Sequence, residues 1–252
     1  MINSNYLQEK AYAKINLTLR ILRKMDNNYH VIDSIITFLP DLYDNIFIKK
    51  SNRLVISTFG EFSGTLCKMG GDTIVEKTIY FLQKKYNISS NFEIKIKKNI
   101  PLGAGLGGGS ADAAAVARLI LKTHNLNIKK KEIIDNLSNI GADIPVCYYS
   151  FNQRVEGFGE KITKLKTFNK TMWALLIKPN APLSTKEIFK KFTKPFSFQP
   201  NYKYNYKNLI FDIKHSKNDL QKIAENSSFQ FKYVLKSLPK TKEAITIPKM
   251  TG

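Results

Sequence analysis

The chain has little of the side-chain chemistry on which several enzyme classes depend. Its 252 residues include 2 cysteines, 3 histidines and 1 tryptophan, and no CxxC pair occurs. No two histidines have the spacing of metal ligands, and no serine lies in a G-x-S-x-G segment. We therefore expect no zinc site and no acyl-transfer triad. The few cysteines indicate a reducing compartment without structural disulfides.

Acidic residues and long apolar runs are also scarce. Only 20 acidic residues accompany 40 basic ones, which gives a formal charge of +20. The lysines are scattered and form no single stripe, so we expect no specific nucleic-acid partner, although the charge favours anionic substrates. The longest apolar runs, such as 172–177, are far too short to span a bilayer, and the first residues lack an apolar signal core. We expect a cytoplasmic protein without a membrane partner.

What the chain does have is a dense glycine segment. Five of its 13 glycines fall within the seven positions 103–109, and an alanine-rich run, 113–121, follows. Glycine permits positive φ and lets backbone N–H groups approach a ligand, and the first turn of a helix attracts anions. The segment therefore predicts a phosphate-binding loop that opens a helix.

Flanking residues separate this loop from two other phosphate motifs. A Walker loop requires lysine directly before Ser110, where this chain has glycine. Gly103, Gly105 and Gly108 satisfy the dinucleotide spacing, but the preceding run, 92–97, alternates like a half-exposed antiparallel strand. The Walker alternative is excluded, whereas a dinucleotide loop and a loop without any ligand stay open.

Periodicity indicates a β-rich beginning followed by a mixture of helices and strands. We expect strands at 7–21, 35–48, 92–96, 146–151, 173–177 and 244–248. We expect helices at 73–86 with a Thr73-x-x-Glu76 capping box, at 113–121, at 130–140 with Gly141 as a left-handed cap, at 184–192, 218–225 and 228–238. The stretch 194–207 is typical of a loop. The sequence pattern changes near Lys170, and this change predicts two domains, 1–168 and 169–252.

Two charged residues stand in apolar surroundings. Lys14 interrupts the strand-like run 11–17, where alternation by itself predicts an exposed lysine. Asp143 lies between Ala142 and Ile144, and an isolated carboxylate there is either paired or caps a turn. A lysine and an aspartate beside a phosphate loop would form a phosphotransfer site, in which the carboxylate accepts a hydroxyl proton and the ammonium stabilises charge.

At these positions the chain resembles the GHMP kinase superfamily, and within it the kinases that act on 4-diphosphocytidyl-2-C-methyl-D-erythritol in non-mevalonate isoprenoid biosynthesis. The superfamily loop is matched by Pro101, Gly105, Leu106, Ser110 and Ala111. The narrower resemblance rests on the segments 13–17, Tyr29-His30, 105–110, 141–146 and 156–160. Weaker matches occur at 178–179, 184–189 and 218–220. These segments recur in family order over nearly the whole chain.

The resemblance implies a fold and a reaction. The implied fold is α+β, with an N-terminal domain like ribosomal protein S5 domain 2 and a ferredoxin-like C-terminal domain. That second domain is expected to be incomplete, because Met250-Thr251-Gly252 matches only the opening of a third family motif. The implied protein is an ATP-dependent small-molecule kinase that uses Mg²⁺. Its substrate is a cytidine diphosphate derivative of methylerythritol, and it acts as a monomer or weak homodimer.

The implied site residues divide by role. Lys14 and Asp143 form the catalytic pair, with Asp143 as the base on the C2 hydroxyl. The ATP-binding residues are Pro101, Leu102, Gly103, Ala104, Gly105, Leu106, Gly107, Gly108, Gly109, Ser110 and Ala111, and Ser110 also helps to hold Mg²⁺. The substrate-binding residues are Asn16, Tyr29, His30 and Phe189, and Lys98 approaches the nucleotide.

Two other functions stay open. One is a GHMP kinase for a different alcohol, such as mevalonate or homoserine, although Tyr29-His30 argues against it. The other is an inactive remnant whose positive charge binds RNA.

Overall fold

The computed structural model describes residues 5–26, 29–64, 72–165, 172–180, 183–200, 206–238 and 249–251. The chain divides into two units. Unit 1 contains Met1–Lys14, Phe38–Leu102 and Leu106–Ser150, and unit 2 contains Ile15–Thr37, Gly103–Gly105 and Phe151–Gly252. Each unit is built from several segments, so the division into 1–168 and 169–252 stays a prediction. The boundary predicted near Lys170 lies outside the described residues.

Two long strands supply residues to both units. β1 (Leu7–Lys24) pairs with β2 (His30–Ser51), and both strands are longer than the alternation predicted. In unit 1, residues 45–51 of β2 pair antiparallel with β4 (Asn91–Lys97), which also pairs in parallel with β3 (Val55–Phe59). In unit 2, residues 32–36 of β2 pair antiparallel with β5 (Gln153–Gly157), and β5 pairs with β6 (Lys161–Lys164).

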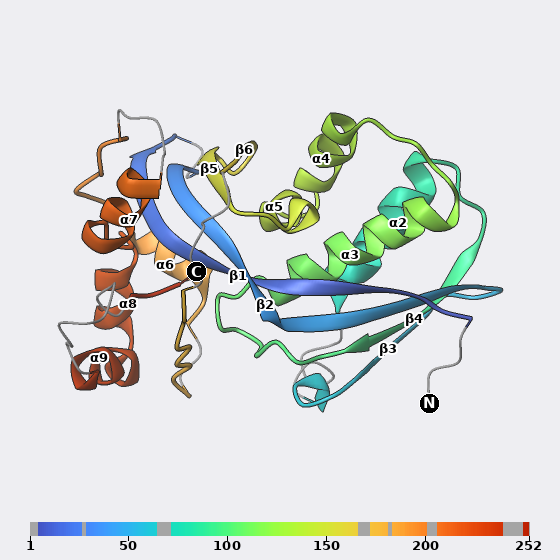
Figure 1. Cartoon of the computed structure of the whole chain (residues 1–252), viewed down its shortest axis with the longest axis horizontal. Helices are drawn as coiled ribbons and strands as arrows, with labels where there is room; N and C mark the ends of the chain where they lie inside the picture. Colours follow the sequence, from blue (N-terminus) through green and yellow to red (C-terminus); the bar gives the residue numbers. More distant parts are fainter. Residues whose placement is uncertain are drawn as a thin grey trace. The chain divides into compact units, whose positions relative to one another are not determined.

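Helices α2 (Thr73–Lys85), α3 (Gly108–Thr123), α4 (Lys130–Ser138) and α5 (Asp143–Tyr149) lie on one face of the strands of unit 1 (Figure 1). The core between strands and helices includes Ile46, Ile48, Ile94, Ile96, Val75, Ile79, Leu82, Val116 and Leu119. Helix α3 packs against both α2 and α5, and its alanines are buried.

Three local predictions in unit 1 are wrong. The cap of α2 is Asp72 instead of Thr73, since the Asp72 carboxylate accepts the N–H of Val75 at 3.2 Å. The strand expected at 146–151 is mostly helix α5, which tolerates Pro145 because this residue lies in the first turn, where its missing N–H costs nothing. Helix α4 ends at Ser138, and Gly141 does not adopt the left-handed conformation expected of a cap.

The helices of unit 2 pack around two small hydrophobic clusters. They are α6 (Thr185–Lys191), α7 (Tyr206–His215), α8 (Gln221–Ser227) and α9 (Phe229–Ser237). One cluster consists of Leu19, Ile21, Ile188, Phe192, Leu220 and Ala224. The other consists of Ile35, Leu165 and two residues of α7, Leu209 and Ile213. Helix α6 is capped as predicted, because the Ser184 side chain accepts the N–H of Glu187 at 3.3 Å.

Two predictions for unit 2 are wrong. Helix α7 begins inside the predicted loop 194–207, and residues 173–177 form no strand within the described part of the chain. The strand predicted at 244–248 lies outside the described residues. None of the helices that the structure describes is both long and apolar enough to cross a membrane.

Candidate functional site

Lys14 lies on β1 and is buried against the end of the glycine segment. Its backbone N–H donates to the carbonyl of Leu106 at 2.9 Å, and only 5% of its side chain is exposed. A Cβ placed on Gly107 would lie 2.8 Å from Cγ of Lys14, so only glycine at position 107 leaves room for this lysine. The alternation predicted an exposed lysine, and this is wrong because Ala13 and Lys14, on opposite faces of the strand, are both buried.

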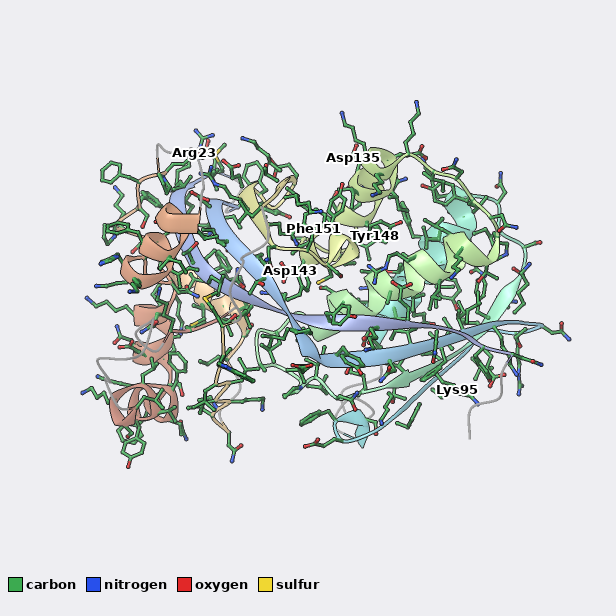
Figure 2. All side chains as sticks on the ribbon, viewed as in Figure 1. Arg23, Lys95, Asp135, Asp143, Tyr148 and Phe151 are labelled. Carbon is green, nitrogen blue, oxygen red and sulfur yellow. The ribbon has the colours of Figure 1, made fainter. Side chains whose placement is uncertain are left out.

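Asp143, labelled in Figure 2, is the first residue of α5, and its carboxylate forms an ion pair with the ammonium of Lys14. Its Oδ2 atom is 3.7 Å from Nζ of Lys14, and 47% of its side chain is exposed. Of the two roles expected for this carboxylate, the structure therefore shows the paired one. A half-exposed carboxylate held by a buried ammonium can accept a proton from a hydroxyl group that arrives from solvent.

The glycine segment turns into α3 through left-handed residues. Gly103, Gly105 and Gly107 have φ values of 64°, 71° and 68°. Gly107 is the N-cap residue of α3, and among the described residues no side chain caps this helix, so its first-turn N–H groups remain available. Ser110 lies in the same turn. Uncapped N–H groups at the positive end of a helix form a binding site for an anion such as phosphate.

The strand before this segment disfavours a dinucleotide loop. Such loops follow a strand of a parallel sheet that helices cover on both faces. Here β4 pairs antiparallel with β2, and its alternate residues Phe92, Ile94 and Ile96 are buried while the residues between them are not. The half-exposed strand that the sequence predicted is confirmed.

In unit 2, the aromatic residues of the predicted substrate site form two contacts. His30 is 8% exposed, and its ring centroid lies 5.5 Å from that of Phe189 and 6.0 Å from that of Phe192. Tyr29 is 64% exposed and meets the ring of Phe158 edge-on, with the centroids 6.1 Å apart. Phe158 was not among the predicted site residues, although it lies inside the family segment 156–160.

The surroundings of His30 favour a neutral imidazole. Burial lowers the pKa of His30 from 6.5, and the charge of Lys24 lowers it further, while a hydrogen bond with the backbone of Phe192 opposes this shift. Its Nε2 atom is buried and finds no hydrogen-bond partner among the residues that the structure describes. A buried, unsatisfied ring nitrogen can form one hydrogen bond to a ligand.

Asn16 is bonded to the last described segment of the chain. Its backbone N–H donates to Oγ1 of Thr251 at 2.9 Å, and its side-chain amide donates to Oγ of Ser34 at 2.8 Å. The same segment is held by Asn218, whose amide donates to the carbonyl of Met250 at 3.0 Å. The structure thus joins two sequence segments that the family resemblance singled out separately, 218–220 and the opening of the third motif.

Unit 2 also contains a buried ion network that was not predicted from the sequence. Asp33 is fully buried and accepts two hydrogen bonds from Arg154, both at 2.9 Å, while Arg20 donates to Asp212 at 2.6 Å. Burial lowers the pKa of the neighbouring Lys249 to about 8, with Asp212 opposing the shift and Arg20 adding to it. Arg20 and Asp33 interrupt strand-like runs as Lys14 does, and this signal could have found them.

Lys98 is not exposed to a nucleotide. Its side chain is fully buried, and its ammonium donates to Asp44 and Asp112, each at 2.5 Å. The expectation that Lys98 approaches the nucleotide is therefore wrong, because two aspartates from distant parts of the sequence enclose it.

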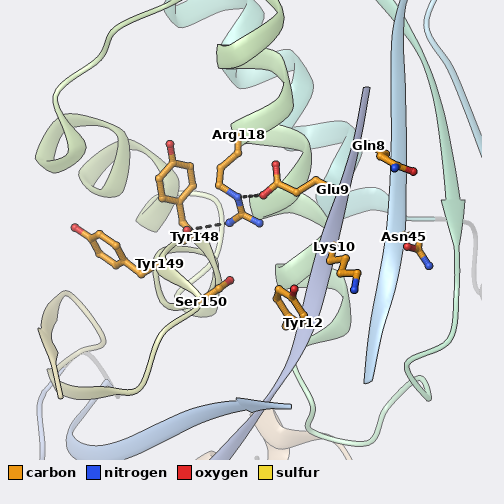
Figure 3. A pocket seen from close by; sticks show the side chains of 9 residues that line it. All are labelled: Gln8, Glu9, Lys10, Tyr12, Asn45, Arg118, Tyr148, Tyr149 and Ser150. Carbon is orange, nitrogen blue, oxygen red and sulfur yellow. Dashed lines mark hydrogen bonds and ion pairs between the residues drawn. The ribbon is translucent and has the colours of Figure 1, made fainter. Parts of the chain in front are cut away.

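A pocket of about 530 Å³ opens on unit 1 (Figure 3). It is lined by Gln8, Glu9, Lys10, Tyr12, Asn45, Arg118, Tyr148, Tyr149 and Ser150. The Arg118 guanidinium donates to Glu9 and to the carbonyls of Cys147 and Tyr148, the latter two at 3.1 and 2.9 Å. No predicted site residue lines this pocket.

Comparisons with known proteins identify the family. Residues 73–151 match the family described as GHMP kinases N terminal domain. The 4-diphosphocytidyl-2-C-methyl-D-erythritol kinase of Clostridium botulinum (strain Alaska E43 / Type E3) is 38% identical over 184 residues, which cover 73% of this chain and 64% of that protein. The kinase of the same name from Clostridium beijerinckii is 34% identical over 239 residues, which cover 94% of this chain and 83% of that protein. The chain belongs to the 4-diphosphocytidyl-2-C-methyl-D-erythritol kinase family.

The fold of this kinase family agrees with the structure. A crystal structure of 4-(cytidine 5'-diphospho)-2C-methyl-D-erythritol kinase has a TM-score of 0.69 at 20% identity and covers 91% of this chain and 81% of its own. The mevalonate kinase of Methanococcus jannaschii has a TM-score of 0.57 at 15% identity, covering 100% of this chain and 88% of its own. These likenesses concern the fold alone, and the predicted α+β GHMP kinase fold is confirmed. The chain spans 64% of the length of the Clostridium botulinum kinase.

Proposed function

We propose that this protein transfers the γ-phosphoryl group of ATP to the C2 hydroxyl of 4-diphosphocytidyl-2-C-methyl-D-erythritol, the compound in the name of its relatives. One observation carries the proposal. The Lys14–Asp143 ion pair lies beside the uncapped start of α3, because Lys14 bonds to Leu106 and packs against Gly107. A proton acceptor and a cation thus stand where the helix would hold a phosphate.

Each residue then has a separate task in the transfer. The N–H groups of segment 101–111 hold the phosphates of ATP, helped by the dipole of α3. Asp143 accepts the hydroxyl proton as the hydroxyl oxygen bonds to the γ-phosphorus, and the bond from that phosphorus to the oxygen of ADP breaks. The ammonium of Lys14 offsets the negative charge on the transferring group. General-base catalysis of this kind contributes about 10² to 10⁴ in rate.

Mg²⁺ would enter this site with the nucleotide. Within the described ranges, no group of three or more His, Cys, Asp or Glu side chains could hold a metal ion. A kinase does not need such a group, because Mg²⁺ keeps several waters and binds mainly through substrate phosphates. The hydroxyl of Ser110 in the first turn of α3 fits the role of a single protein ligand. When bound, Mg²⁺ neutralises charge on the phosphates.

We assign recognition of the cytosine base to unit 2. The exposed ring of Tyr29 offers a surface on which a base can stack, and Phe189 lies half-buried beside His30. The unsatisfied Nε2 of His30 supplies a hydrogen bond to the base. Asn16, held by Thr251 and Ser34, is assigned to the remainder of the substrate.

A substrate panel tests this assignment. The protein is incubated with ATP and Mg²⁺ and, in separate reactions, with 4-diphosphocytidyl-2-C-methyl-D-erythritol, mevalonate or homoserine, and the products are identified by ³¹P NMR. We expect ADP and a new phosphomonoester only with the cytidine compound. Phosphorylation of mevalonate or homoserine instead would assign a different GHMP kinase activity. No ADP from any alcohol, together with steeply salt-dependent RNA binding, would refute the kinase proposal.

A further inference from the structure

One buried ion cluster joins the residues on both sides of segment 101–107, which we call the phosphate loop. The Nζ atom of Lys98 is 2.5 Å from Oδ2 of Asp44 and 2.5 Å from Oδ2 of Asp112, and all three side chains are 0% exposed. Asp44 comes from β2, Lys98 directly follows β4, and Asp112 comes from α3. One ammonium group therefore links three elements of unit 1.

Asp44 fixes the backbone where the segment begins. Its Oδ1 atom accepts the N–H groups of Asn99 at 2.6 Å and of Ile100 at 2.8 Å, the last two residues before the segment. The N–H of Lys98 donates to the carbonyl of Phe59 at 2.7 Å. The two carboxylate oxygens of Asp44 together accept hydrogen bonds from Lys98, Asn99 and Ile100. Asp44 thus fixes each of the three residues that precede the loop.

Asp112 fixes the helix where the segment ends. It lies about one turn beyond Gly108, the first residue of α3. A Cβ on Gly108 would lie 3.2 Å from Cγ2 of Ile100, so the start of the helix packs directly on the entry to the loop. The bond from Lys98 to Asp112 therefore sets where the first-turn N–H groups of α3 stand relative to residues 98–100.

The two neighbouring aspartates favour the charged form of the Lys98 ammonium. Burial by itself lowers the pKa of Lys98, but Asp112 and Asp44 outweigh burial and raise it above the usual value. Burial raises the pKa of Asp112 well above its usual range, with Lys98 opposing the rise and with Asp44 and Asp72 adding to it. A buried ion pair adds little net stability, because desolvation offsets the attraction. Its short, charge-assisted hydrogen bonds nevertheless fix geometry.

We propose that Lys98 is a positioning residue for nucleotide binding, which fixes both ends of the phosphate loop through Asp44 and Asp112. The inference rests on the proposed function, since it takes this segment to bind the phosphates of ATP. Lys98 acts without touching the nucleotide, because its side chain is fully buried. Its role is to hold the loop's N–H groups in place before the nucleotide arrives.

Substitutions of Asp112 distinguish this positional role from a purely electrostatic effect on nucleotide binding. If only charge mattered, removing a carboxylate near the start of α3 would strengthen the binding of an anion. If the geometry matters, removing it frees one end of the loop and weakens binding. Asn at position 112 keeps an oxygen that accepts from Lys98, so Asp112→Asn should behave like the wild type.

Isothermal titration calorimetry with ADP and Mg²⁺ tests the proposal on the whole chain. The variants are Lys98→Met, Asp112→Ala and Asp112→Asn. The control is Leu82→Ala, which removes a fully buried side chain near the end of α2 in the same unit. Circular dichroism at the titration temperature confirms that each variant is folded. We expect the ADP Kd to rise about tenfold or more in Lys98→Met and Asp112→Ala, and to stay near the wild-type value in Asp112→Asn and Leu82→Ala.

Each alternative outcome has a definite meaning. An unchanged or lower ADP Kd in Asp112→Ala overturns the positional role, and so does an equal rise in Leu82→Ala. If Lys98→Met does not fold, the comparison of Asp112→Ala with Asp112→Asn decides by the same criterion. A wild-type chain that binds no ADP overturns the proposed function and this inference together. Wild-type binding with no difference among folded variants overturns the inference alone.

Discussion

Replacing Gly107 by alanine probes the contact between the glycine segment and Lys14. The backbone at position 107 is left-handed, with a φ of 68°, which costs an alanine about 1 to 2 kcal/mol. The added Cβ would also lie 2.8 Å from Cγ and 3.2 Å from Cε of Lys14. Lys14 is buried and paired with Asp143, so the overlap should cost about 1 to 3 kcal/mol more, as other overpacked sites do.

Two nearby glycines provide matched controls for Gly107→Ala. Gly103 is also left-handed, with a φ of 64°, but no described atom lies within 4 Å of its added Cβ. Gly103→Ala should therefore lose only the backbone term of about 1 to 2 kcal/mol. Gly109 is helical and equally open in the described structure, so Gly109→Ala should gain about 0.5 to 1 kcal/mol.

Urea denaturation of the three variants and the wild type measures these differences. The expected order of unfolding free energy is Gly109→Ala, wild type, Gly103→Ala and then Gly107→Ala, from highest to lowest. The difference between the last two isolates the contact with Lys14, because both positions carry the same backbone strain. If Gly107→Ala lost no more than Gly103→Ala, the packing of Lys14 against position 107 would be refuted.

Two further predictions concern unit 2. Because burial and Lys24 lower the pKa of His30 from 6.5, the unfolded chain takes up this proton first, and the free energy of unfolding falls as the pH drops below 6.5 toward the folded-state pKa. An NMR titration should give His30 a pKa below 6.5, and a value at or above 6.5 would contradict its burial. Asp33→Asn should lower the free energy of unfolding by about 3 to 5 kcal/mol, because Arg20 and Arg154 lose a buried carboxylate. A loss under about 1 kcal/mol on urea denaturation would show that the network contributes no more than exposed ion pairs do.

Elements with short-range signals could be predicted from the sequence. The cap of α6 was predictable because the Ser184 hydroxyl and the N–H that it accepts are three residues apart. The strands β3, β5 and β6 escaped prediction because each has only four or five residues, too few for a sustained alternation. They exist because β4, β2 and β5 supply hydrogen-bonding partners for β3, β5 and β6 respectively, which no local window contains.

The site could be predicted only in part for the same reason. Lys14 and Asp143 are far apart in the sequence, so no local spacing relates them, and only the resemblance to a kinase family paired them. Their 3.7 Å separation agrees with that pairing. The enclosure of Lys98 by Asp44 and Asp112 was missed because each residue reads locally as an exposed charge. Burial of both faces of a strand, as at Lys14, likewise depends on tertiary packing.

The rate of ADP formation in Asp143→Asn tests the central claim most directly. Asn keeps the size of the side chain and removes the proton acceptor, and circular dichroism checks that the variant is folded. With ATP, Mg²⁺ and 4-diphosphocytidyl-2-C-methyl-D-erythritol, we predict a kcat about 10² to 10⁴ lower than that of the wild type. A folded Asp143→Asn variant that forms ADP at the wild-type rate would contradict the account.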